Sequence, residues 1–204
     1  MKKILLVIVL FGIYGCSYLS SHVIYYKDLP SLEAKYGIGT QIFEWVDSTR
    51  YEDFTQTEDD YRRLIIQIWY PAIIADVNAK PAPYLDHPNE QIEAIAEQLE
   101  IPSYLLTNIK NISTNSYFNA PIISDQGAFP MLMFSHGLGG MKNQNSIQIE
   151  ALVQQGYIIV APDHAYDANI TVFNDGTIAD FRSGSERIDT EEQFWEYRLP
   201  QLQK

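Results

Sequence analysis

The stretch that decides the fold is Phe129–Gly140, which reads FPMLMFSHGLGG. Its first half, Phe129–Phe134, is a continuous apolar run of strand length, and such runs are typical of strands buried on both faces. Its second half is rich in glycine, which lets a backbone turn sharply and bring its amides close to a ligand. We therefore predict a buried strand that runs directly into a functional loop.

The residues that follow predict a βαβ unit. Asn145–Gln155 has apolar residues at helical spacing, Gly156 fits the position just after a helix, and Tyr157–Ala161 is a second wholly apolar strand. Such a unit requires parallel pairing of its strands and a right-handed crossover. Further on, Asn174–Gly176 is a hairpin-turn signal between two short strands, and Glu191–Leu202 has the pattern of a terminal helix.

Upstream of the loop, two strand-like segments flank an acidic stretch. Thr40–Val46 and Arg63–Tyr70 are rich in β-branched and aromatic residues, the second ending before a proline, and together they predict an antiparallel hairpin. Ala72–Pro88 is rich in proline and predicts an extended surface connection. Asn89–Glu100 predicts an amphipathic helix and Pro102–Ile109 a second short one. This pair can form a packed core face, which the pattern favours, or a flap facing membrane or substrate.

The N-terminus has the pattern of an export signal. A short positive start precedes the apolar run Ile4–Tyr14, which is shorter than the roughly 20 residues that span a bilayer. Cys16 follows a glycine, as in a bacterial lipobox, where the cysteine is diacylated; an uncleaved anchor with an incidental cysteine is the alternative. We expect an exported cell-envelope protein, either a membrane-anchored lipoprotein or a periplasmic or extracellular one. Residues 1–16 would be the leader or anchor, 17–39 a linker and 40–204 the main domain.

The composition excludes several functions. With 46% apolar and 20% charged residues, the 204-residue chain is globular rather than disordered. A net charge of −12 repels phosphate backbones, so nucleic acid is not an expected partner, and it also argues against simple docking on anionic lipid. Because Cys16 is the single cysteine, neither an internal disulfide nor a cysteine-based metal site is possible.

The loop His136–Gly140 has the pattern of a loop that supplies backbone donors for acyl transfer. The reaction needs backbone N–H donors aimed at the oxygen that becomes negative in the tetrahedral intermediate. In α/β-hydrolases, part of this oxyanion hole comes from a glycine-rich loop after the third strand. A phosphate-binding loop is a weaker interpretation, because neither Gly-x-Gly-x-x-Gly nor Walker spacing is present. A glycine-rich turn without a ligand is the third interpretation.

Side chains near the loop could in principle form a catalytic pair or a metal site. Ser135 and His136 are sequence neighbours, so their side chains diverge and we do not expect them to form a catalytic pair. A metal cluster of His136, Asp163 and His164 is conceivable, but the spacing of metal ligands is absent. We expect His164 and Asp167 instead to shape the rim of the site or to satisfy loop backbone groups.

Several separated blocks occur in a fixed order over roughly residues 37–182. They are TQIFEWVDS from Thr40, IQIWYPA from Ile66, FPMLMFSHGLGG from Phe129, GYIIVAPDHAYD from Gly156 and TVFNDG from Thr171. Together they resemble the platelet-activating factor acetylhydrolases of the lipoprotein-associated phospholipase A2 type. This resemblance is far more specific than the glycine loop alone.

The resemblance implies the α/β class and an α/β-hydrolase fold, with an antiparallel hairpin leading into a parallel βαβ sheet. It implies a serine esterase that removes short or oxidised acyl groups from the middle position of a glycerophospholipid, with no metal or cofactor. It places Leu138, on the same loop as Gly137, as one oxyanion donor. The alternatives are a general esterase or dienelactone-type hydrolase acting on small esters, and a non-catalytic exported lipoprotein with a decayed hydrolase fold.

The chain departs from the family pattern in one respect. Family members carry their nucleophile in a Gly-x-Ser-x-Gly elbow downstream of the TVF block, followed by Asp and His, and residues 1–204 contain no such elbow. We therefore expect the N-terminal portion of the hydrolase domain, without its catalytic triad. Lacking the strand before the elbow, Pro130–Phe134 would expose an apolar edge, and the isolated chain would fold poorly and hydrolyse no ester.

Overall fold

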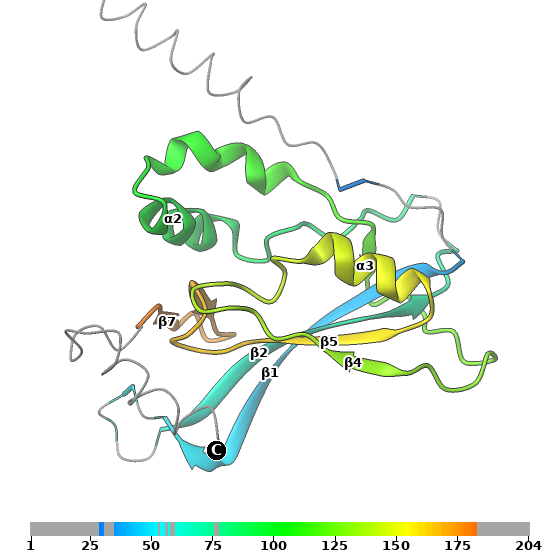
Figure 1. The fold of residues 1–204 in the computed structure, drawn as a ribbon, viewed down its shortest axis with the longest axis horizontal. Coiled ribbons are helices and arrows are strands. Elements are labelled where there is room, and N and C mark those ends of the chain that lie inside the picture. Colours follow the sequence, from blue (N-terminus) through cyan, green and yellow to red (C-terminus); the bar gives the residue numbers. More distant parts are fainter. Residues whose placement is uncertain are drawn as a thin grey trace, which may run out of the picture.

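The computed structural model describes residues 29–30, 35–52, 54–55, 57, 60–75 and 78–182. They form a five-stranded mixed sheet in the order β3-β1-β2-β5-β4 and a separate two-stranded sheet, β6-β7. Helix α3 covers one face of the larger sheet, and the short helices α2 and η1 lie beyond it on the same side (Figure 1). The predicted leader 1–16 with Cys16, and the predicted helix Glu191–Leu202, lie outside the described residues.

Two long strands, β1 and β2, form the predicted antiparallel hairpin. β1 spans Gly37–Tyr51 and β2 spans Tyr61–Ala72. β1 therefore includes the last three residues of the expected linker. β2 also continues through Pro71, which lies beyond Ile65–Trp69, the part of the strand that pairs with β5. The missing N–H of this proline therefore costs that strand pairing nothing.

The predicted βαβ unit is confirmed. β4 (Met131–Met133) and β5 (Ile158–Asp163) pair in parallel, and α3 (Ser146–Gln154) connects them. Gly156 follows the helix with a φ of +95°, a left-handed conformation that favours glycine. The core between α3 and the sheet contains the buried side chains of Ile38, Trp69, Ile149, Val153, Ile159 and Ala161.

The expectation that the strand before the glycine loop is buried on both faces is wrong. Met131, Leu132 and Met133 are 65%, 40% and 74% exposed. Within the described sheet, β4 is the last strand and pairs with β5 alone, so its side chains have no neighbours on the outer side. The apolar edge expected in the absence of a further strand is therefore present.

Helix α2 (Pro88–Gln98) and the 3-10 helix η1 (Ser103–Asn111) pack together, as the pattern favoured. Their shared core includes Leu85, Ile92, Ala96, Leu106 and Met141. The connection before α2 is not wholly at the surface, because Ala82 and Leu85 are almost completely buried.

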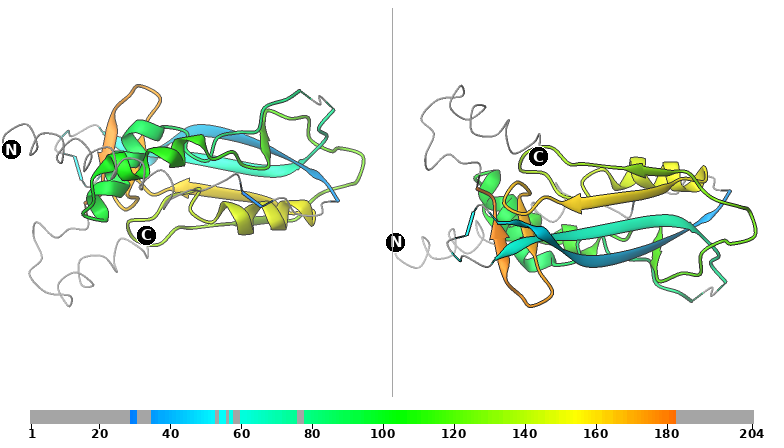
Figure 2. Two further views of the ribbon diagram at one scale, coloured as in Figure 1. Left: turned by 90° about the horizontal axis from the view of Figure 1, so that it is seen from above. Right: turned by 90° about the horizontal axis from the view of Figure 1, so that it is seen from below.

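Three further strands complete the described structure. β3 (Ser116–Phe118) pairs in parallel with β1. β6 (Ile170–Val172) and β7 (Ile178–Asp180) form the predicted second hairpin, which lies at one end of the larger sheet beside α2 (Figure 2). None of the helices in the described ranges combines the length and the hydrophobicity that crossing a membrane requires.

Candidate active site

The glycine loop between β4 and α3 is folded against the segment that follows β5. The Gly140 N–H donates to the Gly137 carbonyl over 2.8 Å, which closes a tight turn within the loop. The Gly139 N–H donates to the Asp167 carbonyl, and the Asn169 N–H donates to the Gly140 carbonyl, each over 2.8 Å. Gly139 has a φ of +71°, which a side chain would strain. Hydrogen bonds within the loop and to the segment after β5 therefore fix the conformation of the loop.

Two backbone amides of this loop are left available. No acceptor within the described residues takes the N–H of Gly137 or of Leu138. Leu138 is also half exposed, so this part of the loop is open to solvent. A free amide on a fixed loop can serve as one donor of an oxyanion hole. The structure thus leaves Gly137 and Leu138, the site residues expected from sequence, free to serve as donors.

His136 joins the ends of the two parallel strands. Its side chain is buried, with Nδ1 2.7 Å from the Gly137 carbonyl oxygen and Nε2 3.0 Å from the backbone nitrogen of His164. Because a carbonyl can only accept, Nδ1 must carry the proton, and Nε2 then accepts from the His164 N–H. The His164 N–H, just beyond β5, is thus paired with His136. Asp167 contacts the loop through its backbone carbonyl, which accepts from the Gly139 N–H.

A serine–histidine pair lies at the same edge of the sheet. The Ser135 Oγ is 2.6 Å from the His164 Nε2, and the rings of His136 and His164 contact edge to face at 5.0 Å. The sequence pattern suggests only the neighbouring His136 as a partner of Ser135, so the pairing with His164 was not predicted. The signal was available, because both residues follow parallel strands whose carboxyl ends meet at one sheet edge.

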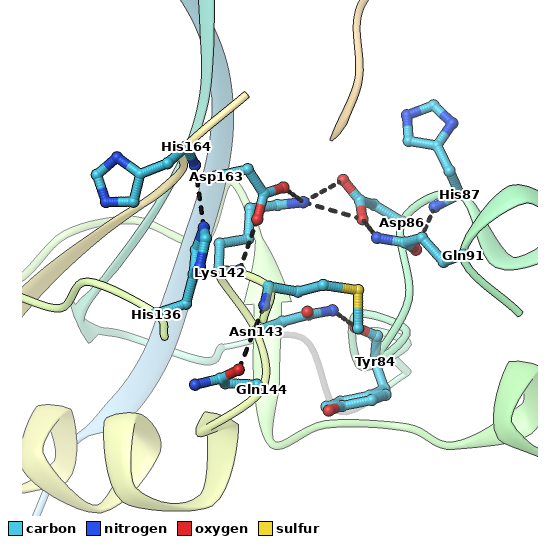
Figure 3. A network of polar contacts seen from close by, with 11 residues as sticks. Tyr84, Asp86, His87, Gln91, His136, Lys142, Asn143, Gln144, Asp163 and His164 are labelled. Atoms are coloured by element: carbon cyan, nitrogen blue, oxygen red, sulfur yellow. Dashed lines mark hydrogen bonds and ion pairs between the residues drawn. The ribbon is translucent and has the colours of Figure 1, made fainter. Parts of the chain in front are cut away.

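A buried lysine, which was not predicted from the sequence, holds the segment that leads into α3. Lys142 is 1% exposed, and its Nζ lies 3.0 Å from Asp163 Oδ2 and 2.9 Å from Asp86 Oδ2 (Figure 3). The Lys142 backbone N–H also donates to Asp163 Oδ1 over 2.6 Å. Asp163 is the last residue of β5, and Asp86 precedes α2. This ion cluster therefore ties the glycine loop both to the sheet and to the helical unit.

The charges of this cluster stabilise each other. Burial alone would lower the pKa of Lys142, but the carboxylates of Asp163 and Asp86 outweigh it and raise that pKa above its usual value. Burial alone would raise the pKa of Asp86, but the Lys142 ammonium group and its hydrogen bond hold that pKa below its usual value. Lys142 is thus a charged structural group and not a proton acceptor at neutral pH.

The conceivable metal cluster does not form. Asp163 is engaged by Lys142, and His136 by two backbone groups. Across the part of the chain that the structure describes, no group of three His, Cys, Asp or Glu side chains is arranged to hold a metal ion.

Comparison with known proteins places this geometry in a family. A ferulic acid esterase from Streptomyces cinnamoneus has a similar structure, with a TM-score of 0.65 and 20% sequence identity; the match covers 87% of this chain and 47% of the esterase. The chain thus spans about half the length of that enzyme, and the likeness shows the α/β-hydrolase fold class. No curated protein matches the sequence. The family model for platelet-activating factor acetylhydrolase, isoform II, matches residues 25–195. The chain therefore belongs to the platelet-activating factor acetylhydrolase, isoform II, family.

Proposed function

We propose that this chain carries the oxyanion-binding part of a serine-type carboxylic ester hydrolase. The observation that carries the proposal is the pair of free amides at Gly137 and Leu138, on a loop that is fixed by hydrogen bonds on both sides. Family membership supports the same reaction class. The substrates we propose are glycerophospholipids with a short or oxidised acyl chain in the middle position.

The mechanism assigns one step to the described residues. A serine attacks the ester carbonyl, a histidine takes its proton as general base, and an aspartate orients the histidine. The carbonyl oxygen becomes negative as the bond forms, and the Leu138 N–H donates a hydrogen bond to it. In the family pattern, the serine follows the Thr171 block in a Gly-x-Ser-x-Gly elbow, and the aspartate and histidine come later still; residues 1–204 contain no such elbow.

Leu138→Pro is expected to lower kcat for an acetyl ester by about 10²–10³-fold, because proline has no N–H to donate. The measurement is made on an enzyme that includes the serine elbow, with a short-acyl phospholipid as substrate. Leu138→Ala is the matched control, since it shortens the side chain and keeps the amide. Full activity of the proline variant would contradict the role of the Leu138 N–H as an oxyanion donor.

The coding DNA beyond codon 204 offers a direct test of the proposal. An open frame that reaches a Gly-x-Ser-x-Gly supports the hydrolase. A stop codon at that point favours the alternative of a non-catalytic lipoprotein.

A general esterase acting on small esters is the second candidate. The solved structure with a similar fold is described as a ferulic acid esterase. A substrate panel of acetyl phospholipids and small aryl esters, assayed on the enzyme with its elbow, separates the two candidates by their kcat/KM values.

We also propose that Cys16 is acylated and attaches the protein to the cell envelope. Each methylene group buried in the bilayer adds about 0.8 kcal/mol of membrane affinity. Cys16→Ser is therefore expected to move the protein from the membrane fraction to the soluble fraction and to change its electrophoretic mobility. Unchanged fractionation and mobility would contradict the lipid anchor and favour an uncleaved apolar leader.

A further inference from the structure

We propose that Ser135 and His164 form a nucleophile–base pair of their own, which takes an acyl group from activated small esters. The pair is independent of the serine elbow that the proposed function requires. It therefore departs from the expectation that the isolated chain folds poorly and hydrolyses no ester. Only residues that the structure describes take part in this pair.

The distance between the two side chains suits proton transfer. Ser135 Oγ and His164 Nε2 are 2.6 Å apart, within the range at which a histidine removes a hydroxyl proton. Ser135 lies two residues beyond the end of β4 and is exposed to solvent. Three residues further along the same loop, the Leu138 N–H has no acceptor within the described residues.

The base is held in place from two sides. The His164 backbone N–H donates to His136 Nε2 over 3.0 Å. The two rings pack edge to face, with their centroids 5.0 Å apart. The preceding residue, Asp163, is bound to the Lys142 backbone N–H over 2.6 Å and to its Nζ over 3.0 Å. A reactive pair needs this kind of support, because small displacements of the base reduce proton transfer.

The covalent step is an ordinary acyl transfer. As the Ser135 Oγ bonds to the ester carbonyl carbon, its proton passes to His164 Nε2. The carbonyl carbon–leaving group bond then breaks, and the proton passes from His164 to the departing oxygen. The product is an acyl ester on Ser135, which water hydrolyses with His164 again as the base. Water is the second reactant, and no metal or oxidant is needed.

The competing explanation is a purely structural hydrogen bond that joins the ends of β4 and β5. The two explanations predict different reactivity. A structural bond leaves Ser135 no more reactive than any other exposed serine. A nucleophile–base pair makes Ser135 the preferred acyl acceptor, and only while His164 is present and the chain is folded.

The experiment treats the full 204-residue chain with p-nitrophenyl acetate and, separately, with a fluorophosphonate. Peptide mass spectrometry then locates the adducts. We expect Ser135 to be the principal labelled residue, and the labelling rate to fall about 10²-fold in His164→Gln. Ser124→Ala, which changes an exposed serine elsewhere, is the matched control and should leave the labelling of Ser135 unchanged.

Two controls keep the outcome decisive. Labelling of the wild-type chain is repeated in denaturing urea, where Ser135 should lose its preference because the pair no longer exists. Circular dichroism shows whether His164→Gln keeps the fold. Absence of a Ser135 adduct in the native chain, or equal labelling in a folded His164→Gln variant, overturns the proposal. Neither result bears on the Leu138 assay, which uses the elbow serine.

Discussion

Replacing Lys142 with methionine is expected to lower the free energy of unfolding by about 3–5 kcal/mol at neutral pH. The substitution keeps a long apolar stem but removes the ammonium group that Asp86 and Asp163 both contact. Asp163 is 1% exposed, so its carboxylate would stay buried without a cation. Urea denaturation followed by circular dichroism measures the change. Lys110→Met, at an exposed position, is the matched control and should stay within about 0.5 kcal/mol of wild type.

The pH dependence of this difference follows from the pKa shifts. The folded pKa of Asp86 lies below its ordinary 3.8, so its contribution is present above that pH and is lost as the pH falls through the folded pKa. The folded pKa of Lys142 lies above its ordinary 10.5, so its contribution is present below that pH and is lost as the pH rises through the folded pKa. The deficit of the Lys142→Met variant should therefore be constant between about pH 5 and 9 and shrink in acid. An equal stability of the variant and wild type at pH 7 would contradict the role of the cluster.

Trp69→Ala is expected to cost about 3–5 kcal/mol of unfolding free energy, because it opens a large cavity in the core. Trp69 is 1% exposed and belongs to the buried cluster between α3 and the sheet, with Ile149, Val153 and Ile159. Thermal denaturation measures the loss. Trp45→Ala on the neighbouring strand is the matched control, since Trp45 is 52% exposed and leaves no cavity. Similar melting temperatures for the two variants would show that this core is not the main source of stability.

The elements of this fold could be predicted from sequence where the signal is local. The apolar run of β5, the glycine after α3 and the turn at Asp175 each occupy a few consecutive residues, and all three predictions were confirmed. The burial of β4 was predicted wrongly, because it depends on a neighbouring strand rather than on the residues of β4. Apolar composition indicates that a strand is suited to burial, but the neighbouring strands decide whether its side chains are buried.

The same distinction explains the candidate site. The glycine loop is a local pattern, so its position after β4 could be predicted. Ser135 and His164 are 29 residues apart in sequence, and Lys142 and Asp86 are 56 apart. No spacing rule connects such positions until the strand order is known. Lysine side chains are mostly exposed in proteins, so the residue type of Lys142 did not indicate that it is buried.

The strand order has a consequence for how the protein is synthesised. β4 precedes β5 in the chain but joins the described sheet only through β5, which in turn pairs with β2. During synthesis the chain leaves the ribosome from its N-terminus. The β1–β2 hairpin can therefore form early, whereas β4 has no strand to pair with until Asp163 has emerged. The glycine loop, which depends on Asp163, His164 and Asp167, is thus among the last parts of the described structure to take shape. Any delay in the docking of β5 would leave this loop open to proteases and chaperones on the nascent chain.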